Sequence, residues 1–214
     1  MIEVISFDMD GTLIHKDFVD YVWLEGIPRI VAANENISLV KAKQYVVQEY
    51  KKIGEDDLLW YNIQYWIDKF QLECHWRTLL LSYRDLIHLY PEVPDVLQCL
   101  RDRYRLIITS NAAREFIQIE TETLGITDTF EYLFSAVTDF QKTKKHPLVY
   151  ECICNTLHVD RDAIVHVGDS WKFDYEAPRK AGIHSYYLDR NAKHKGPYSV
   201  PDLAMFAHAI RLTK

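Results

Sequence analysis

Close to the N-terminus, the sequence reads Val4-Ile5-Ser6-Phe7-Asp8-Met9-Asp10-Gly11-Thr12-Leu13. A short apolar run ends in two carboxylates one residue apart, and the Gly-Thr pair then turns the chain. This pattern predicts a buried strand with Asp8 and Asp10 at its C-terminal end, where α/β sheets bind their ligands. The alternative is an acidic turn whose carboxylates are solvated or cap a helix.

Asp8 and Asp10 are separated by one residue, so on a strand their side chains begin on the same face. Two like charges at that spacing repel each other unless a cation lies beside them. Mg²⁺ is the expected cation, because it is a hard ion that takes oxygen ligands and keeps several of its waters.

Length and composition limit the possible classes of protein. A chain of 214 residues suits one compact core with a smaller inserted module. Hydrophobic residues make up 48% and charged residues 26%, which is typical of a soluble globular protein. The net charge is −6 and no long lysine/arginine block occurs, so a nucleic-acid partner is not expected.

No segment of the sequence predicts export or membrane insertion. The N-terminus leads directly into a strand and lacks the basic flank and apolar run of a signal peptide, and no apolar run reaches membrane-spanning length. We therefore expect a cytoplasmic protein. Of the four cysteines, Cys152 and Cys154 lie two residues apart in a helical pattern, where they point to different sides, so neither zinc nor a disulfide is expected there.

Residues 16–89 have helical periodicity throughout and predict an inserted module of four helices. Ser38 is a suitable N-cap for the second helix, and Gly54 a suitable stop. Gly26-Ile27-Pro28 is expected to break the first helix. The four predicted helices are Asp17–Ala33, Leu39–Lys52, a helix from Asp56 or Asp57 to about Phe70, and Glu73–His88.

Residues 1–15 and 90–214 alternate between strand and helix and predict a doubly wound parallel sheet. Two prolines in Tyr90-Pro91-Glu92-Val93-Pro94 mark the return to this core. After the first strand, the predicted strands are Arg105–Thr109, Tyr132–Ser135, Ala163–Val167 and His184–Leu188. The predicted helices between and after them are 95–102, 113–124, 147–157, 174–181 and 202–211.

Three further polar stretches follow strands or precede helices of this core. Thr109-Ser110-Asn111 offers a hydroxyl, an amide and backbone N–H groups that can hold a phosphate oxygen. Lys142-Thr143-Lys144-Lys145-His146-Pro147 places cations ahead of a helix, and Gly168-Asp169-Ser170, followed by Asp174, forms a second acidic pair. Taken singly, each stretch could instead be a helix cap or a solvated loop.

Together and in this order, the four stretches resemble the motifs of the haloacid dehalogenase (HAD) superfamily of phosphohydrolases, and the resemblance covers essentially the whole chain. The first motif, DxDGT, matches Asp8 to Thr12. The second, an apolar strand that ends in Ser or Thr, matches at Ser110, and the fourth, GDSxxxD, matches Gly168 to Asp174. The resemblance implies a Rossmann-like core with a helical cap of the C1 type at residues 16–89. Because the family keeps selectivity residues near the break at Gly26-Ile27-Pro28, the resemblance also implies a substrate-selecting loop there.

The sequence departs from the family pattern at two points. The third motif of many relatives reads Lys-Pro-x-Pro, and here Lys145 replaces the first proline. Lys144 is therefore favoured as the phosphate-binding lysine, with Lys142 and Lys145 as alternatives. In the fourth motif Phe173 stands where relatives often have Asn, which leaves both acids in place.

The resemblance assigns the chemistry to a few residues. Asp8 would attack the phosphorus of a monoester and become an aspartyl phosphate. Asp10 would protonate the leaving alkoxide and later deprotonate the attacking water. Ser110, the backbone of Asn111 and Lys144 would hold the remaining phosphoryl oxygens.

A magnesium site belongs to the same assignment. Asp8, the backbone carbonyl of Asp10 and Asp169 would bind Mg²⁺, and Asp174 would act from the second shell or through water. The metal and the lysine are needed because an anionic nucleophile cannot approach an anionic phosphate without neutralisation.

These residues imply a Mg²⁺-dependent hydrolase of a small soluble phosphomonoester. Asp10 argues against the dehalogenase branch, whose halide leaves without protonation. Two alternatives stay open: a sugar phosphomutase with the same nucleophile, and a catalytically idle binding protein with the same fold. The sequence indicates neither the oligomeric state nor the identity of the substrate.

The cap is rich in aromatic residues, which could stack on a substrate ring or fill the interior of the cap. The second explanation is favoured, because a small helical module needs large side chains for its core. The aromatic residues concerned are Tyr21, Trp23, Tyr45, Tyr50, Trp60, Tyr61, Tyr65, Trp66 and Trp76.

Overall fold

The computed structural model describes residues 1–144, 146–194 and 196–212. Its centre is a parallel sheet, which confirms the predicted doubly wound α/β fold. The strands lie in the order β3-β2-β1-β4-β5-β6, so β1 is central, between β2 and β4. Their bounds are β1 Val4–Phe7, β2 Arg105–Ser110, β3 Tyr132–Ser135, β4 Ile164–Gly168, β5 His184–Leu188 and β6 Ser199–Val200.

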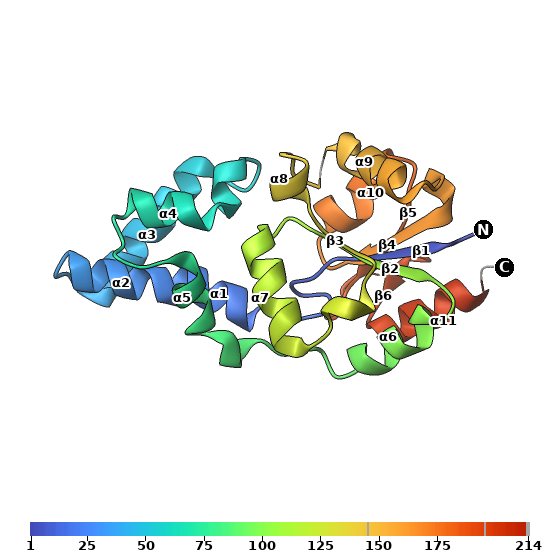
Figure 1. The fold of residues 1–214 in the computed structure, drawn as a ribbon, viewed down its shortest axis with the longest axis horizontal. Coiled ribbons are helices and arrows are strands. Elements are labelled where there is room, and N and C mark those ends of the chain that lie inside the picture. The colour runs from blue at the N-terminus through green and yellow to red at the C-terminus, as the bar shows by residue number, and fades with distance from the viewer. Residues whose placement is uncertain (145, 195, 213–214) are drawn as a thin grey trace.

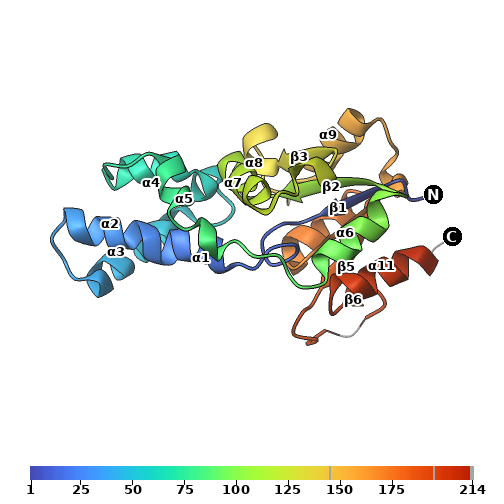
Figure 2. The ribbon, with the colours of Figure 1, turned by 60° about the horizontal axis from the view of Figure 1, so that its bottom comes forward.

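Helices cover both faces of the sheet (Figure 2). Because side chains alternate along a strand, Ile5 and Phe7 enter one apolar core and Val4 enters the other. The first core includes side chains of α6 (Val93–Arg101), α7 (Arg114–Leu124) and α11 (Leu203–Leu212). The second core includes side chains of α9 (Pro147–Leu157). Other elements of this part are α8 (Ala136–Asp139), a π-helical turn at Trp171–Glu176, α10 (Ala177–Lys180) and 3-10 turns at Thr127–Thr129 and Arg161–Ala163.

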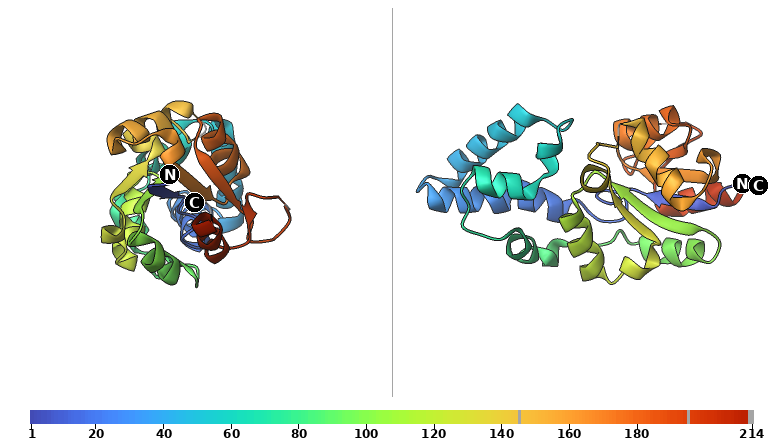
Figure 3. Two further views of the ribbon diagram at one scale, coloured as in Figure 1. Left: turned by 90° about the vertical axis from the view of Figure 1, so that its right-hand side faces the viewer. Right: turned by 45° about the horizontal axis from the view of Figure 1, so that its top comes forward.

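The inserted helices gather beyond the end of the sheet toward which the strands point, and the N-terminal residues lie at the opposite end (Figures 1 and 3). The two connections between the parts run antiparallel to each other. The backbone N–H of His15 donates to the His88 carbonyl at 2.9 Å, and that of Tyr90 donates to the Leu13 carbonyl at 3.0 Å. The inserted helices are α1 (Asp17–Tyr21), α2 (Ile27–Asn34), α3 (Leu39–Ile53), α4 (Ile63–Lys69) and α5 (Trp76–Leu81).

The predicted break at Gly26-Ile27-Pro28 is wrong. α1 continues through a π-helical turn, Val22–Gly26, into α2, and Gly26 has helical dihedral angles of −59° and −59°. Pro28 is tolerated because it lies in the first turn of α2, after the wider π-helical turn, where its missing N–H costs little. The segment is therefore helical, and the prediction of a substrate-selecting loop at this position loses its basis.

Two other predicted helices are shorter than expected, because polar side chains cap new starts inside them. Asn62 accepts from the backbone N–H of Tyr65 at 2.9 Å, which starts α4 after a 3-10 turn at Leu58–Tyr61. His75 accepts from the N–H of Arg77 at 3.2 Å, and α5 ends at Leu81 instead of continuing to His88. A 3-10 turn, Arg84–Leu86, completes the segment.

Other predictions at this level are confirmed. Ser38 caps α3, and Gly54 ends it with a φ of 80°. The four cysteines are all free.

α8 and β6 were not predicted, because four and two residues are too short to show a periodic pattern. Among the described residues, no helix has both the length and the apolar character needed to cross a membrane.

Gly26→Ala tests the packing of the first inserted helix. In an ordinary helix this change stabilises by about 0.5–1 kcal/mol. Here the added Cβ would lie 2.7 Å from Cε2 of Tyr83. We expect the variant to lose about 1–3 kcal/mol of unfolding free energy in urea titration because of this overlap. Adding Tyr83→Leu should recover part of the loss, and a stabilised Gly26→Ala variant would contradict the contact.

Candidate active site

Three adjacent strands deliver polar residues to one edge of the sheet. Phe7 at the end of β1 pairs with Ile108 on β2 and with Val167 on β4. The residues that follow these positions, among them Asp8 and Asp169, therefore meet at the same edge. This is the point where the strand order reverses, at which open α/β sheets usually bind ligands.

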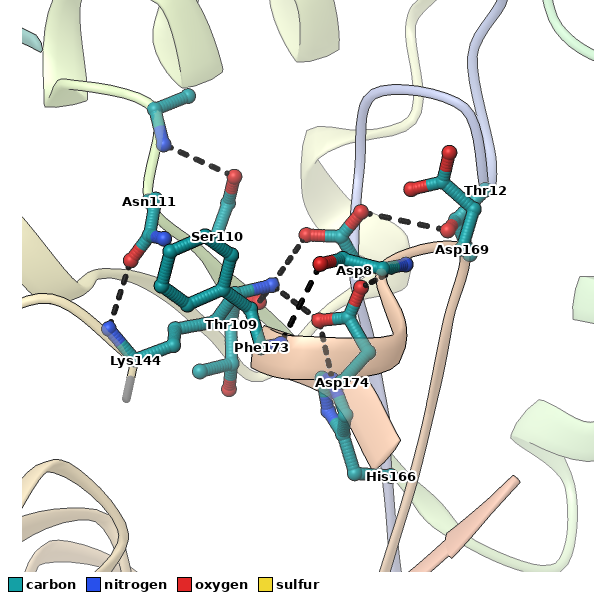
Figure 4. A network of polar contacts seen from close by, with 12 residues as sticks. Asp8, Thr12, Thr109, Ser110, Asn111, Lys144, His166, Asp169, Phe173 and Asp174 are labelled. Carbon is teal, nitrogen blue, oxygen red and sulfur yellow. Dashed lines mark hydrogen bonds and ion pairs between the residues drawn. The ribbon is translucent and has the colours of Figure 1, made fainter. Parts of the chain in front are cut away.

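A buried lysine occupies the centre of this edge (Figure 4). Lys144 is 2% exposed, and its Nζ donates to Asp8 Oδ1 and, at 2.5 Å, to Asp174 Oδ1. The same Nζ donates to the carbonyl of Thr109 at 3.2 Å. The backbone N–H of Lys144 donates to Asn111 Oδ1 at 2.7 Å, so the second and third predicted motifs are bonded directly to each other.

Asp174 is the second carboxylate bonded to Lys144. A series of polar groups across the sheet holds Asp174 in place through hydrogen bonds. Its Oδ2 accepts from the backbone N–H of Ser170 at 2.8 Å, and its Oδ1 lies 3.0 Å from His166 Nε2. His166 Nδ1 lies 2.8 Å from Ser6 Oγ, which lies 2.9 Å from Thr109 Oγ1. All these side chains are buried, so the series satisfies polar groups on β1, β2 and β4 together.

These contacts determine which side chains of the network are charged. Burial alone would lower the pKa of Lys144, but the attraction of Asp174 and Asp8 outweighs it and raises that pKa. Burial would raise the pKa of Asp174, but Lys144 and His166 hold it below its usual range. His166 is kept neutral, because burial lowers its pKa. Asp174 is therefore ionised opposite a charged lysine.

Asp8 differs from Asp174 although both contact the same ammonium group. Burial and the neighbouring Asp174 raise the pKa of Asp8 to about 7, against the pull of Lys144. Its Oδ2 has a single weak partner among the described residues, the Thr12 hydroxyl at 3.3 Å. Asp8 thus keeps a carboxylate oxygen available for other chemistry.

Asp8, Asp169 and Asp174 form an acidic cluster, in which one oxygen from each carboxylate lies within 4.8 Å of the others. Asp169 Oδ2 accepts from Lys16 Nζ at 2.6 Å. Because Asp174 has hydrogen bonds at both oxygens, Asp8 and Asp169 are the members that retain capacity to bind a cation. Their hard oxygen donors fit Mg²⁺ better than a softer metal.

All seven site residues predicted from the sequence line one cavity of about 480 Å³. Its wall also includes residues of the inserted helices, so it lies between them and the sheet. Lys142 is absent from this lining, and Lys145 lies outside the described residues. The predicted residues that line the cavity are Asp8, Asp10, Ser110, Asn111, Lys144, Asp169 and Asp174.

A buried glutamate beside Asp10 was not predicted. Glu120 on α7 is fully buried, and among the described residues neither its carboxylate oxygens nor Asp10 Oδ1 finds a donor outside this pair. Two carboxyl groups that face each other can bond only by sharing a proton. Burial, followed by the charge of Asp10, raises the pKa of Glu120 well above its usual range. Burial also raises the pKa of Asp10, to about 6, although the hydrogen bond with Glu120 lowers it.

Arg190, also missed from the sequence, fixes the turn that carries Asp10. Its guanidinium donates to the carbonyls of Gly11 at 3.3 Å and Thr12 at 2.7 Å, and to Glu92 at 2.8 Å. It also lies 3.4 Å from the centre of the Tyr90 ring. A residue 179 positions from Gly11 thus positions the loop after the first motif.

Two residues that were not predicted, Glu120 and His166, could have been found from the sequence. Phe116, Ile117, Glu120 and Leu124 recur at helical spacing, which places the glutamate on the apolar face of its helix. His166 likewise interrupts an apolar strand. No local pattern marks Arg190, because its partners come from distant segments.

Comparison with known proteins identifies relatives of this chain. The sequence model of the haloacid dehalogenase-like hydrolase family matches residues 2–182. A phosphoglycolate phosphatase of Aliivibrio fischeri is 29% identical over 210 residues, which cover 92% of this chain and 88% of that protein. The GMP/IMP nucleotidase YrfG of Escherichia coli is 22% identical over 79% of this chain and 75% of its own length.

Solved structures of other proteins share the fold of this chain. The crystal structure of a HAD phosphatase from Thermococcus onnurineus superposes with a TM-score of 0.87 and 21% identity, over 98% of both chains. At this identity the superposition establishes a shared fold.

Glu120→Gln tests the carboxyl pair through stability. Because the folded state raises the pKa of Glu120, the unfolded chain releases this proton more readily as the pH rises above about 4.5. Glu120 therefore lowers stability increasingly between pH 5 and 8, and glutamine does not. We expect the metal-free variant to unfold at a higher Tm than the parent, by more at pH 8 than at pH 5.

The matched control is Glu122→Gln, an exposed position on the same helix, which should show no such pH-dependent gain. In a chain of this size, a stabilisation of about 1 kcal/mol raises the Tm by about 2 °C, which is a measurable difference. Equal Tm values for Glu120→Gln and the parent at pH 8 would contradict the shared-proton arrangement.

Proposed function

Because this chain belongs to the haloacid dehalogenase-like hydrolases, we propose that it is a phosphatase that hydrolyses small phosphomonoesters through an aspartyl phosphate on Asp8, with Mg²⁺ as cofactor. The observation that carries this proposal is the buried Lys144 ammonium, which contacts Asp8 and Asp174 in the cavity that Asp10 also lines.

Asp8 is the proposed nucleophile. Lys144 fixes one carboxylate oxygen, which leaves Oδ2 to attack phosphorus while the ammonium draws charge from the transferring group. Ser110 and Asn111 line the same wall and would bind the other phosphoryl oxygens. Lys144 therefore serves both the nucleophile and the phosphate, which explains why a charged side chain is buried here.

Asp10 is the proposed general acid and base. Its raised pKa of about 6 suits a carboxyl group that must give a proton to the leaving alkoxide and later take one from water near neutral pH. Glu120 would hold this carboxyl in place and supply it with a hydrogen bond. Arg190 would fix the backbone of the turn, and with it the carbonyl of Asp10.

The residues present fit a magnesium ion. The site gathers five carboxyl groups (Asp8, Asp10, Glu120, Asp169 and Asp174) against two lysines (Lys16 and Lys144), so a divalent cation would relieve an excess of negative charge. Asp8, the Asp10 carbonyl and Asp169 would bind it, and Asp174 would orient Lys144. When bound, Mg²⁺ would neutralise the charge of the phosphoryl group and lower the barrier to attack by an anion.

Residues 16–89 are the proposed cap domain, and residues 1–15 and 90–214 the core. Side chains of the two parts contact each other at several points. Trp23 stacks on Phe116 with ring centroids 5.5 Å apart, and Lys172 Nζ contacts Glu55 at 2.6 Å and Asp56 at 2.9 Å. A closed cap would exclude water from the phosphoryl intermediate and select the leaving group.

Asp8→Asn tests the nucleophile. We expect phosphate release to fall by at least about 10³-fold, because an amide cannot replace the attacking carboxylate. The metal-free variant should unfold at a Tm no lower than the parent, since the change removes a carboxyl group with a raised pKa. Asp162→Asn, an exposed aspartate, is the control and should keep the parent rate. Turnover by Asp8→Asn within tenfold of the parent would overturn the assignment.

The metal site has its own test, a calorimetric titration of the protein with MgCl₂. Asp169→Asn should weaken Mg²⁺ binding by at least tenfold, because it replaces a charged ligand. Lys16→Met should bind Mg²⁺ at least as tightly as the parent, because the competing ammonium on Asp169 is gone. Unchanged affinity in Asp169→Asn would refute the proposed ligand set, and so would phosphate release that survives chelation by EDTA.

A further inference from the structure

The cavity that holds the acidic residues extends into an aromatic region on the side of the inserted helices. Its wall there contains rings from three segments of these helices and one ring from α7. We call this region the aromatic end of the cavity, and its rings are Trp23, Tyr50, Trp60 and Phe116. Val19, Leu24 and Val47 add apolar surface to the same lining.

The four rings form one connected group. Trp23 stacks on Phe116 at an interplanar angle of 21°, and it meets Tyr50 edge to face with centroids 5.8 Å apart. Tyr50 in turn contacts Trp60, with centroids 6.1 Å apart. The Tyr50 hydroxyl donates to the Trp23 carbonyl at 3.1 Å, which fixes the two residues to each other. The rings are thus preorganised rather than free to collapse into the cavity.

Other aromatic residues of the inserted helices show what a purely structural ring looks like here. Trp66 is fully buried, bonds through Nε1 to the Trp60 carbonyl at 3.2 Å and does not line the cavity. Trp66 therefore belongs to the interior of the helical module, whereas Trp23 and Trp60 are half-buried and line the cavity. The prediction that the aromatic residues serve only to fill the module does not account for these two.

The charges of the lining disfavour a carboxylate on the leaving group. No arginine lines the cavity among the residues that the structure describes. Lys144 is bonded to Asp8 and Asp174, and Lys16 to Asp169, which leaves Lys51 as the remaining lysine of the described lining. Asp20 lines the same part and would repel an anionic tail.

The size of the cavity also exceeds what a small acid ester needs. A volume of about 480 Å³ lies within the range of roughly 300–1,000 Å³ that is usual for sites of drug-sized ligands. A phosphoryl group beside the carboxylates would leave room for a ring system at the aromatic end.

We propose, on the basis of the phosphatase function above, that the aromatic end of the cavity binds a planar aromatic ring of the leaving group, so that the preferred substrates are phosphate esters of nucleosides or of aromatic alcohols. Rings that are already fixed in place gain stacking contacts without a large loss of side-chain entropy. Asp20 and Lys51 supply polar contacts to heteroatoms of such a ring.

Matched pairs of esters test the proposal with the intact enzyme and Mg²⁺. Adenosine 5′-monophosphate and ribose 5-phosphate share the sugar phosphate, and the first adds the base. Phenyl phosphate and phosphoglycolate contrast an aromatic with a carboxylate leaving group. We expect kcat/KM to favour the aromatic member of at least one pair by about tenfold or more, mainly through KM, as expected when a base or ring stacks on an aromatic side chain.

The two pairs also distinguish a nucleoside base from a small aryl group as the source of the ring. Preference within the first pair assigns nucleotides, and preference within the second pair alone assigns small aryl esters. If the aromatic member is favoured in neither pair, the proposal is overturned and the phosphatase function is left standing.

Variants of the tryptophans test which side chains cause the preference for an aromatic leaving group. Trp23→Leu should reduce the ratio of kcat/KM values in the favoured pair at least threefold. Trp76→Leu removes a half-buried tryptophan that does not line the cavity, and it should leave that ratio unchanged. Circular dichroism checks folding, and Trp60→Leu replaces Trp23→Leu if the latter does not fold. Equal ratios in the parent and in the folded cavity variant would refute the assignment of these rings.

Binding measurements distinguish a failure of the phosphatase proposal from a failure of the aromatic-ring proposal. If no ester releases phosphate, the proposed phosphatase function is wrong, and calorimetry of the metal-free protein with adenosine and with ribose decides the second question. Binding of adenosine that is stronger than binding of ribose, and that is weakened by Trp23→Leu, supports an aromatic-ring site. Absence of adenosine binding overturns it.

Discussion

The contact on which the rest of the site depends is the buried ammonium group of Lys144 between Asp8 and Asp174. A lone charge in this interior would be costly, and it is tolerated because it is paired and hydrogen-bonded on several sides. Loss of both carboxylates would leave an uncompensated buried charge. The pairing also requires that β1, the loop before α9 and the turn after β4 adopt one arrangement, so the ion pairs fix the relative positions of the segments that carry the four motifs.

The two anionic partners of this lysine serve different ends. Asp174 is bonded at both oxygens and to His166, so its charge is stabilised and its position is fixed. Asp8 keeps one oxygen with little support, and among the described residues neither Asp10 Oδ1 nor the Glu120 carboxyl group has a donor outside this pair. These unsatisfied groups cost stability, which the two apolar cores of the sheet can offset. The pattern is one of rigid support around a reactive carboxylate.

The inserted helices contribute to the site through the same side chains that hold them together. Tyr50 packs against Trp66 in the interior of the module and against Trp23 at the wall of the cavity. The sequence favoured packing over ligand binding for the aromatic residues, whereas the structure divides them between the interior of the module and the wall of the cavity. A cavity wall that is part of a packed core is preorganised, and preorganised surfaces bind with a smaller loss of entropy.

Five of the six strands, the turns that end them and the side chains at those ends could be predicted from the sequence, because hydrophobic alternation, glycine turns and capping residues act within a few residues. The sequence therefore predicted the sheet and placed Asp8, Ser110 and Asp169 at strand ends, and the resemblance to the family's third motif favoured Lys144. Tertiary structure decided the continuity of the helix through Gly26, the pairing of Glu120 with Asp10, and the bonds of Arg190 to the turn after Asp8. Each of these depends on which distant segment packs alongside, and a local pattern can show that a polar group is buried but not which partner it meets.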